Sequence, residues 1–227
     1  MDLYTKDFFD LTTTPELGWL SSCTYQWEAF LKLAPWFASL QLGEIKGNVS
    51  PLAVVESNVR IGVGTVVEAG AIIKGPAIIG SHCEIRAGAY IRGNVYVGDN
   101  SVVGHGTEIK DAILLQGVRV DHFNYIRSSI LGNSTRLGAS AILASMKIPL
   151  SEIIIRQDDK AWPTGMEKFG AVVGDGTEVG CNAVLNPGSI LGKDSIIYPL
   201  VSWRGVLPHH HIAKSSTEVV LRREKYE

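Results

Sequence analysis

The sequence predicts an all-β solenoid, a parallel β-helix of about seven coils, because one six-residue period governs most of the chain. From Val49 to Ile109, every sixth residue is isoleucine or valine, eleven positions in a row, and chance would give this run with a probability of roughly 10⁻⁷. A small or β-branched residue stands two places before each of them, as a narrow packed interior requires. Six residues suffice for one short strand and one corner, and three such units make a coil of about 18 residues.

The period continues beyond Ile109, with two one-residue deletions and one long interruption. It runs to Ile197 and comprises 22 hexads, which predicts the solenoid over residues 47–203. Residues 146–171 lack the period and are predicted to form a long inserted loop. A loop of this length in a compact domain is usually functional or disordered, and we expect an ordered, functional one. After Ile109 the inward positions are Leu114, Val120, Ile126, Leu131, Leu137 and Leu143, followed by Val173, Val179, Leu185, Leu191 and Ile197.

The two ends of the chain lie outside the period. Residues 1–46 contain Pro15-Glu16, a helix-start signal, and then tryptophans and other apolar residues at helical spacing. They predict an N-terminal helical cap of one or two short helices. We expect this cap to cover the open first coil, since an uncovered coil end is an exposed sheet edge. Residues 204–227 are predicted to form a C-terminal extension.

The composition limits the classes of function. The chain has 227 residues, 21 basic and 23 acidic side chains and a net charge of -2, which argues against a nucleic-acid partner. No run of 18 apolar residues occurs, so no membrane span is expected. The N-terminus shows no signal peptide. Cys23, Cys83 and Cys181 lack metal-ligand spacing and cannot all pair, so we expect a cytoplasmic protein.

Four cations recur once per coil. Lys74, Arg92 and Lys110 are 18 residues apart, and the first one-residue deletion makes Arg127 the next equivalent position. Neighbouring coils lie about 4.8 Å apart, so the side chains should form a ladder whose members repel by up to about 1 kcal/mol per pair. Either an anion such as a phosphate binds against this ladder, or the side chains simply diverge into solvent.

Two histidines also recur one coil apart. His105 and His122 each lie two residues beyond an inward valine, at another corner of the coil. Histidine accepts a proton near neutral pH, so either could be a general base, although both could equally be surface residues. The run His209-His210-His211 follows the last regular repeat and is predicted to be solvated rather than a metal site.

The stretch from Arg92 to Ala139 resembles the acetyltransferase domain of the bifunctional glucosamine-1-phosphate acetyltransferase/N-acetylglucosamine-1-phosphate uridylyltransferases. The acceptor site of that family combines an arginine, a V-E-V-K segment and an H-x-x-Y segment. Here Arg92, Thr107-Glu108-Ile109-Lys110 and His122-Phe123-Asn124-Tyr125 correspond without a gap. The segment from Thr164 to Asp175 resembles archaeal bifunctional sugar-1-phosphate nucleotidylyltransferase/acetyltransferases, whose second lysine corresponds to Lys168. The resemblance spans roughly residues 50–200.

This resemblance implies a left-handed β-helix that assembles as a homotrimer, with active sites between subunits and the 146–171 loop reaching the neighbour. It also implies an acyl-CoA-dependent, metal-free transferase, with acetyl-CoA as the expected donor and a phosphorylated or nucleotide-linked sugar as acceptor. His122, rather than His105, would be the general base. The implied substrate contacts are Arg92, Lys110, Tyr125, Arg136 and Lys168, and those to CoA are Ala139 and Cys181.

The departures from the family leave alternatives open. Arg136 and Ser145 stand where the family has asparagines, which suits an acceptor with a further anionic group or a different sugar. No glycine-rich nucleotide loop precedes the first hexad, so nucleotidylyl transfer is not expected. One rival function is a non-catalytic sugar-phosphate-binding protein. Another resembles the zinc-dependent trimeric carbonic anhydrases, with His105 and His122 as ligands, but those enzymes need a third histidine.

Overall fold

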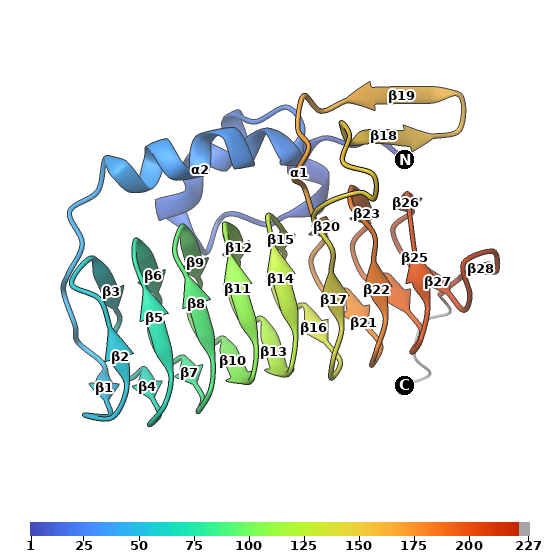
Figure 1. The fold of residues 1–227 in the computed structure, drawn as a ribbon. Helices are drawn as coiled ribbons and strands as arrows, with labels where there is room; N and C mark the ends of the chain where they lie inside the picture. Colours follow the sequence, from blue (N-terminus) through green and yellow to red (C-terminus); the bar gives the residue numbers. More distant parts are fainter. Residues whose placement is uncertain (223–227) are drawn as a thin grey trace.

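The chain winds through a parallel β-helix with three long sheets, and the helical segment and a hairpin lie along one side of it (Figure 1). This computed structural model describes residues 1–222. The coil is left-handed, as Figure 1 shows. The predicted fold class is therefore confirmed.

Sheet B has ten strands, which are parallel except for the last. They are β1 (Asn48–Val49), β4 (Val66–Val67), β7 (Glu84–Ile85), β10 (Val102–His105), β13 (Arg119–His122), β16 (Arg136–Leu137), β21 (Glu178–Val179), β24 (Ile196–Ile197), β27 (His211–Ala213) and β28 (Val219–Leu221).

Sheet C has eight strands. They are β2 (Val54–Val55), β5 (Ile72–Lys74), β8 (Tyr90–Arg92), β11 (Glu108–Lys110), β14 (Tyr125–Arg127), β17 (Ile142–Leu143), β22 (Val184–Leu185) and β25 (Ser202–Trp203).

Sheet A also has eight strands. They are β3 (Val59–Ile61), β6 (Ala77–Ile79), β9 (Val95–Val97), β12 (Ala112–Leu114), β15 (Ile130–Leu131), β20 (Ala171–Val173), β23 (Ser189–Leu191) and β26 (Val206–Leu207). With eight strands in each of two sheets, the solenoid has more coils than the seven or so predicted. The six-residue repeat of aliphatic residues ended at Ile197, because the next inward position is occupied by Trp203, which is 6% exposed.

The register of sheet A confirms both one-residue deletions and the interruption. Val97 pairs with Leu114, Leu114 with Leu131, and Leu131 with Val173 across the inserted loop. All four side chains are fully buried in the core of the prism. The coil therefore shortens by removing a corner residue while its inward side chains stay stacked.

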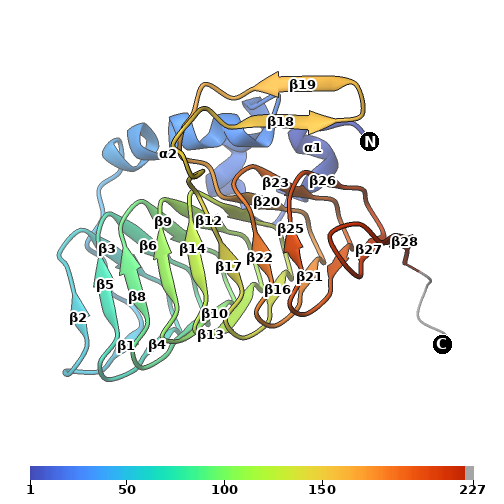
Figure 2. The ribbon, with the colours of Figure 1, turned by 45° about the vertical axis from the view of Figure 1, so that its right-hand side comes forward.

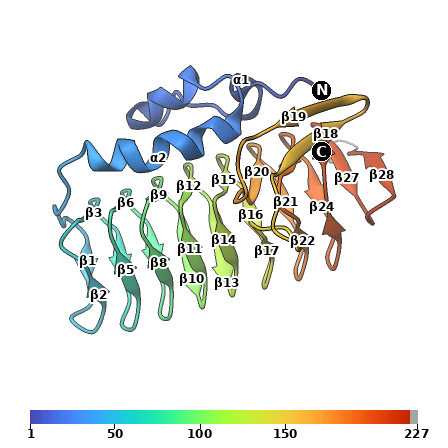
Figure 3. The same cartoon turned by 45° about the horizontal axis from the view of Figure 1, so that its top comes forward.

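The N-terminal helices do not cover the first coil, contrary to our expectation. Helix α1 (Thr5–Phe8), the 3₁₀ segments Pro15–Ser22 and Gln26–Glu28, and α2 (Ala29–Ala38) lie along the outer face of sheet A (Figures 1 and 3). The physical reason is that this face is apolar, and a second core forms between it and the helices. The outward residues of sheet A in this core are Ile78, Tyr96, Ile113, Ile130, Val172 and Ile190.

The inserted loop carries a hairpin, β18 (Ile154–Gln157) and β19 (Lys160–Pro163), which lies beside the N-terminal segment (Figure 2). Ile153, Ile155 and Phe169 are buried in the second core, and the Phe169 ring lies 5.3 Å from that of Phe30. The loop is thus anchored on its own chain, and contact with a neighbouring subunit stays a prediction.

At the other end, strands β26 and β27 continue the coil past residue 203 as far as Ala213. Residues 223–227, the end of the predicted C-terminal extension, lie outside the described residues. Within residues 1–222, no helix has both the length and the apolar character needed to cross a bilayer.

Close stacking at the corners generates the first prediction. Gly104 lies near the end of β10, directly before His105. A methyl group on Gly104 would overlap the backbone carbonyl of Asp121 in the next coil. We expect Gly104→Ala to lower the free energy of unfolding by about 1–3 kcal/mol, the usual cost of overpacking. Gly18 has open space around it, so Gly18→Ala should change stability by less than about 0.5 kcal/mol. Urea unfolding of both variants measures this, and equal stabilities would contradict the tight corner.

A half-buried histidine, His209, generates the second prediction. The Nδ1 atom of His209 accepts a hydrogen bond of 2.8 Å from the amide of Lys193, and its ring lies 5.3 Å from that of Phe8 in α1. Burial, followed by the positive charges of His210 and Lys193, lowers the pKa of His209 below 6.5, and Asp7 opposes this shift.

Because the folded-state pKa is the lower one, the contribution of neutral His209 to stability is complete above about pH 6.5 and is lost as the pH falls through the folded value. Thermal unfolding between pH 7.5 and 5 should therefore show a loss of stability that is smaller in His209→Gln. An identical pH dependence in the two proteins would show that His209 is not responsible.

Candidate active site

The two predicted histidines stack at the corner between sheets B and C, which we call corner BC. His105 and His122 are paired in register at the ends of β10 and β13, and both are exposed. The amide of Asn182 donates to the carbonyl of Ala139, and the register of β16 and β21 therefore places Ala139 and Cys181 on the same line. The residues expected to contact CoA thus continue the line of histidines into the later coils.

The rings of the two histidines differ in how they are held. His105 Nδ1 lies 2.6 Å from the carbonyl oxygen of Ala87. Because a carbonyl only accepts, Nδ1 carries the proton in neutral His105, and Nε2 is left free as a base. The His105 ring also lies 5.1 Å from that of Phe123, edge on. Among the described residues, His122 has no side-chain hydrogen bond. Sequence reasoning missed the fixed ring of His105. Its partner is the backbone carbonyl of Ala87, and a carbonyl is present at every position, so the sequence carries no signal for this contact.

The carboxylate next to His122 is engaged elsewhere. Asp121 Oδ1 accepts from Arg119 at 3.0 Å and from Arg86 at 3.3 Å. Asp121 is therefore held toward the arginines of the sheet B face and does not orient the imidazole of His122.

The cation ladder exists and runs along the opposite edge of sheet C, at the corner with sheet A, which we call corner CA. Lys74 pairs with Arg92, and Lys110 pairs with Arg127. The Nζ of Lys74 lies 5.6 Å from the centre of the Tyr90 ring, and the guanidinium carbon of Arg92 lies 5.8 Å from it. Two cations thus share one aromatic ring, which offsets part of their repulsion.

Glu108 neutralises one member of this ladder. Arg92 Nη1 donates to Glu108 Oε1 at 2.6 Å, and this bond raises the pKa of the Arg92 guanidinium. Among residues 1–222, Lys110 forms no ion pair. Arg127 Nε is buried without a hydrogen-bond partner in the described part of the chain. The ladder therefore offers Lys110 and Arg127 as donors for an anion, and Arg92 would exchange Glu108 for it.

Tyr125 and Lys168 flank the ladder. Tyr125 is half-buried on the outer face of sheet C, in register with Glu108, two residues before Arg127. Lys168 is exposed, and the next residue, Phe169, donates its amide to the carbonyl of Ser145 at 3.0 Å. Lys168 thus stands where the inserted loop returns to corner CA, beyond the last cation of the ladder.

Arg136 lies on the other side of corner BC. It is exposed on sheet B, in register with Arg119 and Glu178. Together with Gly138, Gly180 and Tyr198 it lines an open groove of about 540 Å³. The small corner residues Gly138 and Gly180 leave this groove open beside the line of His122, Ala139 and Cys181.

The predicted site residues therefore form two groups in one chain. His122 lies at one edge of sheet C, while Arg92, Lys110 and Lys168 lie at the opposite edge. A three-residue strand separates the edges, which is about 10 Å. Tyr125 lies on the face between them. In the described residues, no three histidine, cysteine or acidic side chains converge where a metal could bind, so the zinc alternative would need ligands from a partner.

Comparisons with known proteins agree with this architecture. A family model described as the GMPPB C-terminal domain matches residues 73–158. The chain is 42% identical over 149 residues to the bifunctional protein GlmU of Methanococcus maripaludis, covering 63% of this chain and 36% of that protein. It is 33% identical over 150 residues to the uncharacterized acetyltransferase YaiX of Escherichia coli, covering 66% of this chain and 65% of that protein.

Among solved structures, UDP-N-acetylglucosamine acyltransferase of Francisella novicida matches with a TM-score of 0.55 and 15% identity, covering 77% of this chain and 64% of that one. The chain has the left-handed β-helix fold of the hexapeptide-repeat acyltransferases. The chain is also similar to a bifunctional sugar-1-phosphate nucleotidylyltransferase/acetyltransferase of Sulfurisphaera tokodaii. The two are 26% identical over 96 residues, which is 42% of this chain and 24% of that protein. The chain thus spans about a quarter of that relative's length.

Proposed function

We propose that this protein transfers an acyl group from acyl-CoA, with acetyl-CoA as the donor, to an amino or hydroxyl group of a phosphorylated or nucleotide-linked sugar. The observation that carries this proposal is the placement of an exposed histidine at one edge of sheet C and of a row of cations at the other, in which Glu108 pairs with Arg92 only. Similarity to the uncharacterized acetyltransferase YaiX over 66% of the chain supports the reaction class.

The proposed chemistry needs one base. His122 takes the proton from the acceptor amine or hydroxyl as that group attacks the thioester carbonyl. The tetrahedral intermediate then collapses, the carbon–sulfur bond breaks, and CoA leaves as the thiol after receiving the proton from the imidazolium. No covalent enzyme intermediate is required, so the exposed Cys181 is assigned a place beside CoA rather than a nucleophilic role.

The ladder supplies binding and orientation. Lys110 and Arg92 would hold the sugar phosphate through charge-assisted hydrogen bonds, and Lys168 would close the end of the row. Fixing the phosphate positions the reacting group at the base and so lowers the entropic part of the barrier. Tyr125, on the face between the two edges, would contact the sugar.

The separation of the two groups suggests that a complete site needs two subunits. In a homotrimer, His122 of one subunit would face the ladder of its neighbour, and the acceptor would lie between them. The groove beside Gly138 and Gly180 would receive CoA. Arg136 would then contact an anionic group near the reaction centre.

The third prediction separates the histidines. We expect His122→Ala to lower the rate of thiol release from acetyl-CoA by about 10²–10⁴-fold with an amino-sugar phosphate as acceptor. His105→Ala, the matched control one coil away, should cost much less. Assembly and CoA binding should be unchanged in both variants. If His105→Ala proves the more damaging change, the fixed ring of His105 is the base and our assignment is wrong. A wild-type protein that binds sugar phosphates but releases no thiol with any acceptor would favour the non-catalytic alternative.

The fourth prediction tests the shared site. His122→Ala and Arg92→Ala should each be nearly inactive alone, the second through weaker acceptor binding. In mixed trimers isolated by two affinity tags, one site of three would combine His122 from one subunit with Arg92 from its neighbour. We therefore expect the mixed trimers to regain about one third of the wild-type rate. Mixed trimers as inactive as their parents would place the whole site within one chain.

A further inference from the structure

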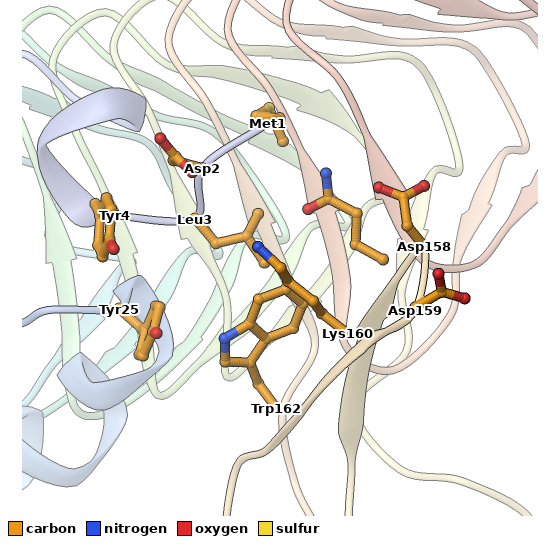
Figure 4. Close-up of a pocket in the computed structure, with 10 residues that line it drawn as sticks. Met1, Asp2, Leu3, Tyr4, Tyr25, Asp158, Asp159, Lys160 and Trp162 are labelled. Atoms are coloured by element: carbon orange, nitrogen blue, oxygen red, sulfur yellow. The ribbon is translucent and has the colours of Figure 1, made fainter.

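A pocket separate from both corners lies between the N-terminal segment and the β18–β19 hairpin (Figure 4). Its volume is about 390 Å³, within the range of small-molecule sites. The two segments that form it, the N-terminal segment and the hairpin, lie on the sheet A side of the prism (Figure 2), whereas corner BC with His122 is the corner opposite that sheet. The lining residues are Met1, Asp2, Leu3, Tyr4, Tyr25, Gln157, Asp158, Asp159, Lys160 and Trp162.

One wall of the pocket is aromatic and held in place. The Tyr25 ring stacks on that of Trp27 with 4.7 Å between centroids and an angle of 3°. The Tyr4 ring also stacks with that of Tyr25, at 6.0 Å and 14°. Trp162, half-buried on β19, adds a second ring (Figure 4). Aromatic faces are electron-rich and attract the polarised C–H groups on the flat face of a sugar ring.

The remaining wall is rich in hydrogen-bond acceptors. Asp2 comes from the N-terminal segment, and Asp158 and Asp159 from the tip of the hairpin (Figure 4). The side-chain oxygen Oε1 of Gln157 is buried and has no hydrogen-bond partner among the described residues. A buried acceptor without a partner is rare in folded proteins, and a turn of the Gln157 amide into the pocket would let a ligand hydroxyl satisfy it.

The charges of the pocket indicate which ligands it disfavours. Among the side chains that line the pocket, three carboxylates outnumber one ammonium group, that of Lys160, so a phosphate is disfavoured. Corner CA, with its row of cations, has the opposite preference. A ligand with a ring, several hydroxyl donors and no negative charge fits the aromatic wall, the acceptors and the charge together.

We propose that this pocket is a second carbohydrate site, which binds one unphosphorylated sugar unit away from the acyl-transfer site. The sugar ring packs against Trp162, beside the stacked rings of Tyr4 and Tyr25, and its hydroxyl groups donate to Gln157 and to the hairpin carboxylates. Because the pocket combines the N-terminal segment with the inserted loop, the ligand also bridges two segments that are remote in the sequence.

The experiment uses the full-length protein and five free sugars: glucose, galactose, mannose, glucosamine and N-acetylglucosamine. Saturation-transfer NMR detects binding, and titration gives the affinity. We expect at least one sugar to bind. Gln157→Leu should weaken it by about tenfold, the loss expected for one buried hydrogen bond, and Trp162→Leu should weaken it as well. Arg156→Gln, an exposed neighbour on β18 that does not line the pocket, is the matched control and should bind normally.

Two comparisons separate this site from the acyl-transfer site. His122→Ala should retain sugar binding while it loses acyl transfer. In the triple variant Arg92→Ala/Lys110→Ala/Lys168→Ala, which lacks the three cations proposed to hold the phosphate, glucose 6-phosphate should bind the protein more weakly than glucose. The proposal is overturned if no sugar in the panel binds, if Gln157→Leu and Trp162→Leu bind as tightly as the wild type, or if the phosphorylated sugar binds better than glucose in the triple variant. Each of these results leaves the acyl-transfer proposal untouched.

Discussion

The whole molecule depends on the narrowness of the prism interior. Each side of a coil has room for one large aliphatic side chain and one small residue, and these must stack directly on their counterparts in the next coil. Val97, Leu114 and Leu131 keep this stack even where the coil loses a residue. Because inward residues cannot shift, outward residues one coil apart are also held in register. Rows of like residues on the surface, such as the cation ladder and the paired histidines, are direct consequences of this constraint.

The outer faces of the three sheets differ in whether other segments cover them. The face of sheet A is apolar and cannot remain in water, so the N-terminal helices and the inserted loop cover it. Sheets B and C carry charged and aromatic residues outward and keep corner BC open. The molecule therefore has one side that is packed against other segments and another side, formed by sheets B and C, that carries the candidate site residues. The pocket beside Trp162 lies where the two covering segments meet.

The electrostatics of the open side are balanced locally. Glu108 binds Arg92, Tyr90 lies near both Lys74 and Arg92, and Asp121 binds Arg86 and Arg119. These partners allow rows of cations to stand about 4.8 Å apart without large repulsion. Lys110 and Arg127 have no such carboxylate among the described residues, which leaves positive charge in the last two members of the ladder, next to Tyr125.

The sequence by itself determined the solenoid, its register and the rows of equivalent side chains, because a period of six residues repeated many times leaves a single way to stack the inward positions. It predicted that Arg127 follows Lys110 and that His122 stacks on His105, and the structure agrees. Counting aliphatic residues missed the last coils, since Trp203 can fill the same space.

Only the tertiary structure decided where the helices lie, how the hairpin folds back and which of two stacked histidines has a fixed ring. These features depend on contacts between segments far apart in the sequence, such as Phe30 with Phe169, or on a backbone carbonyl such as that of Ala87. A local repeat carries no information about either.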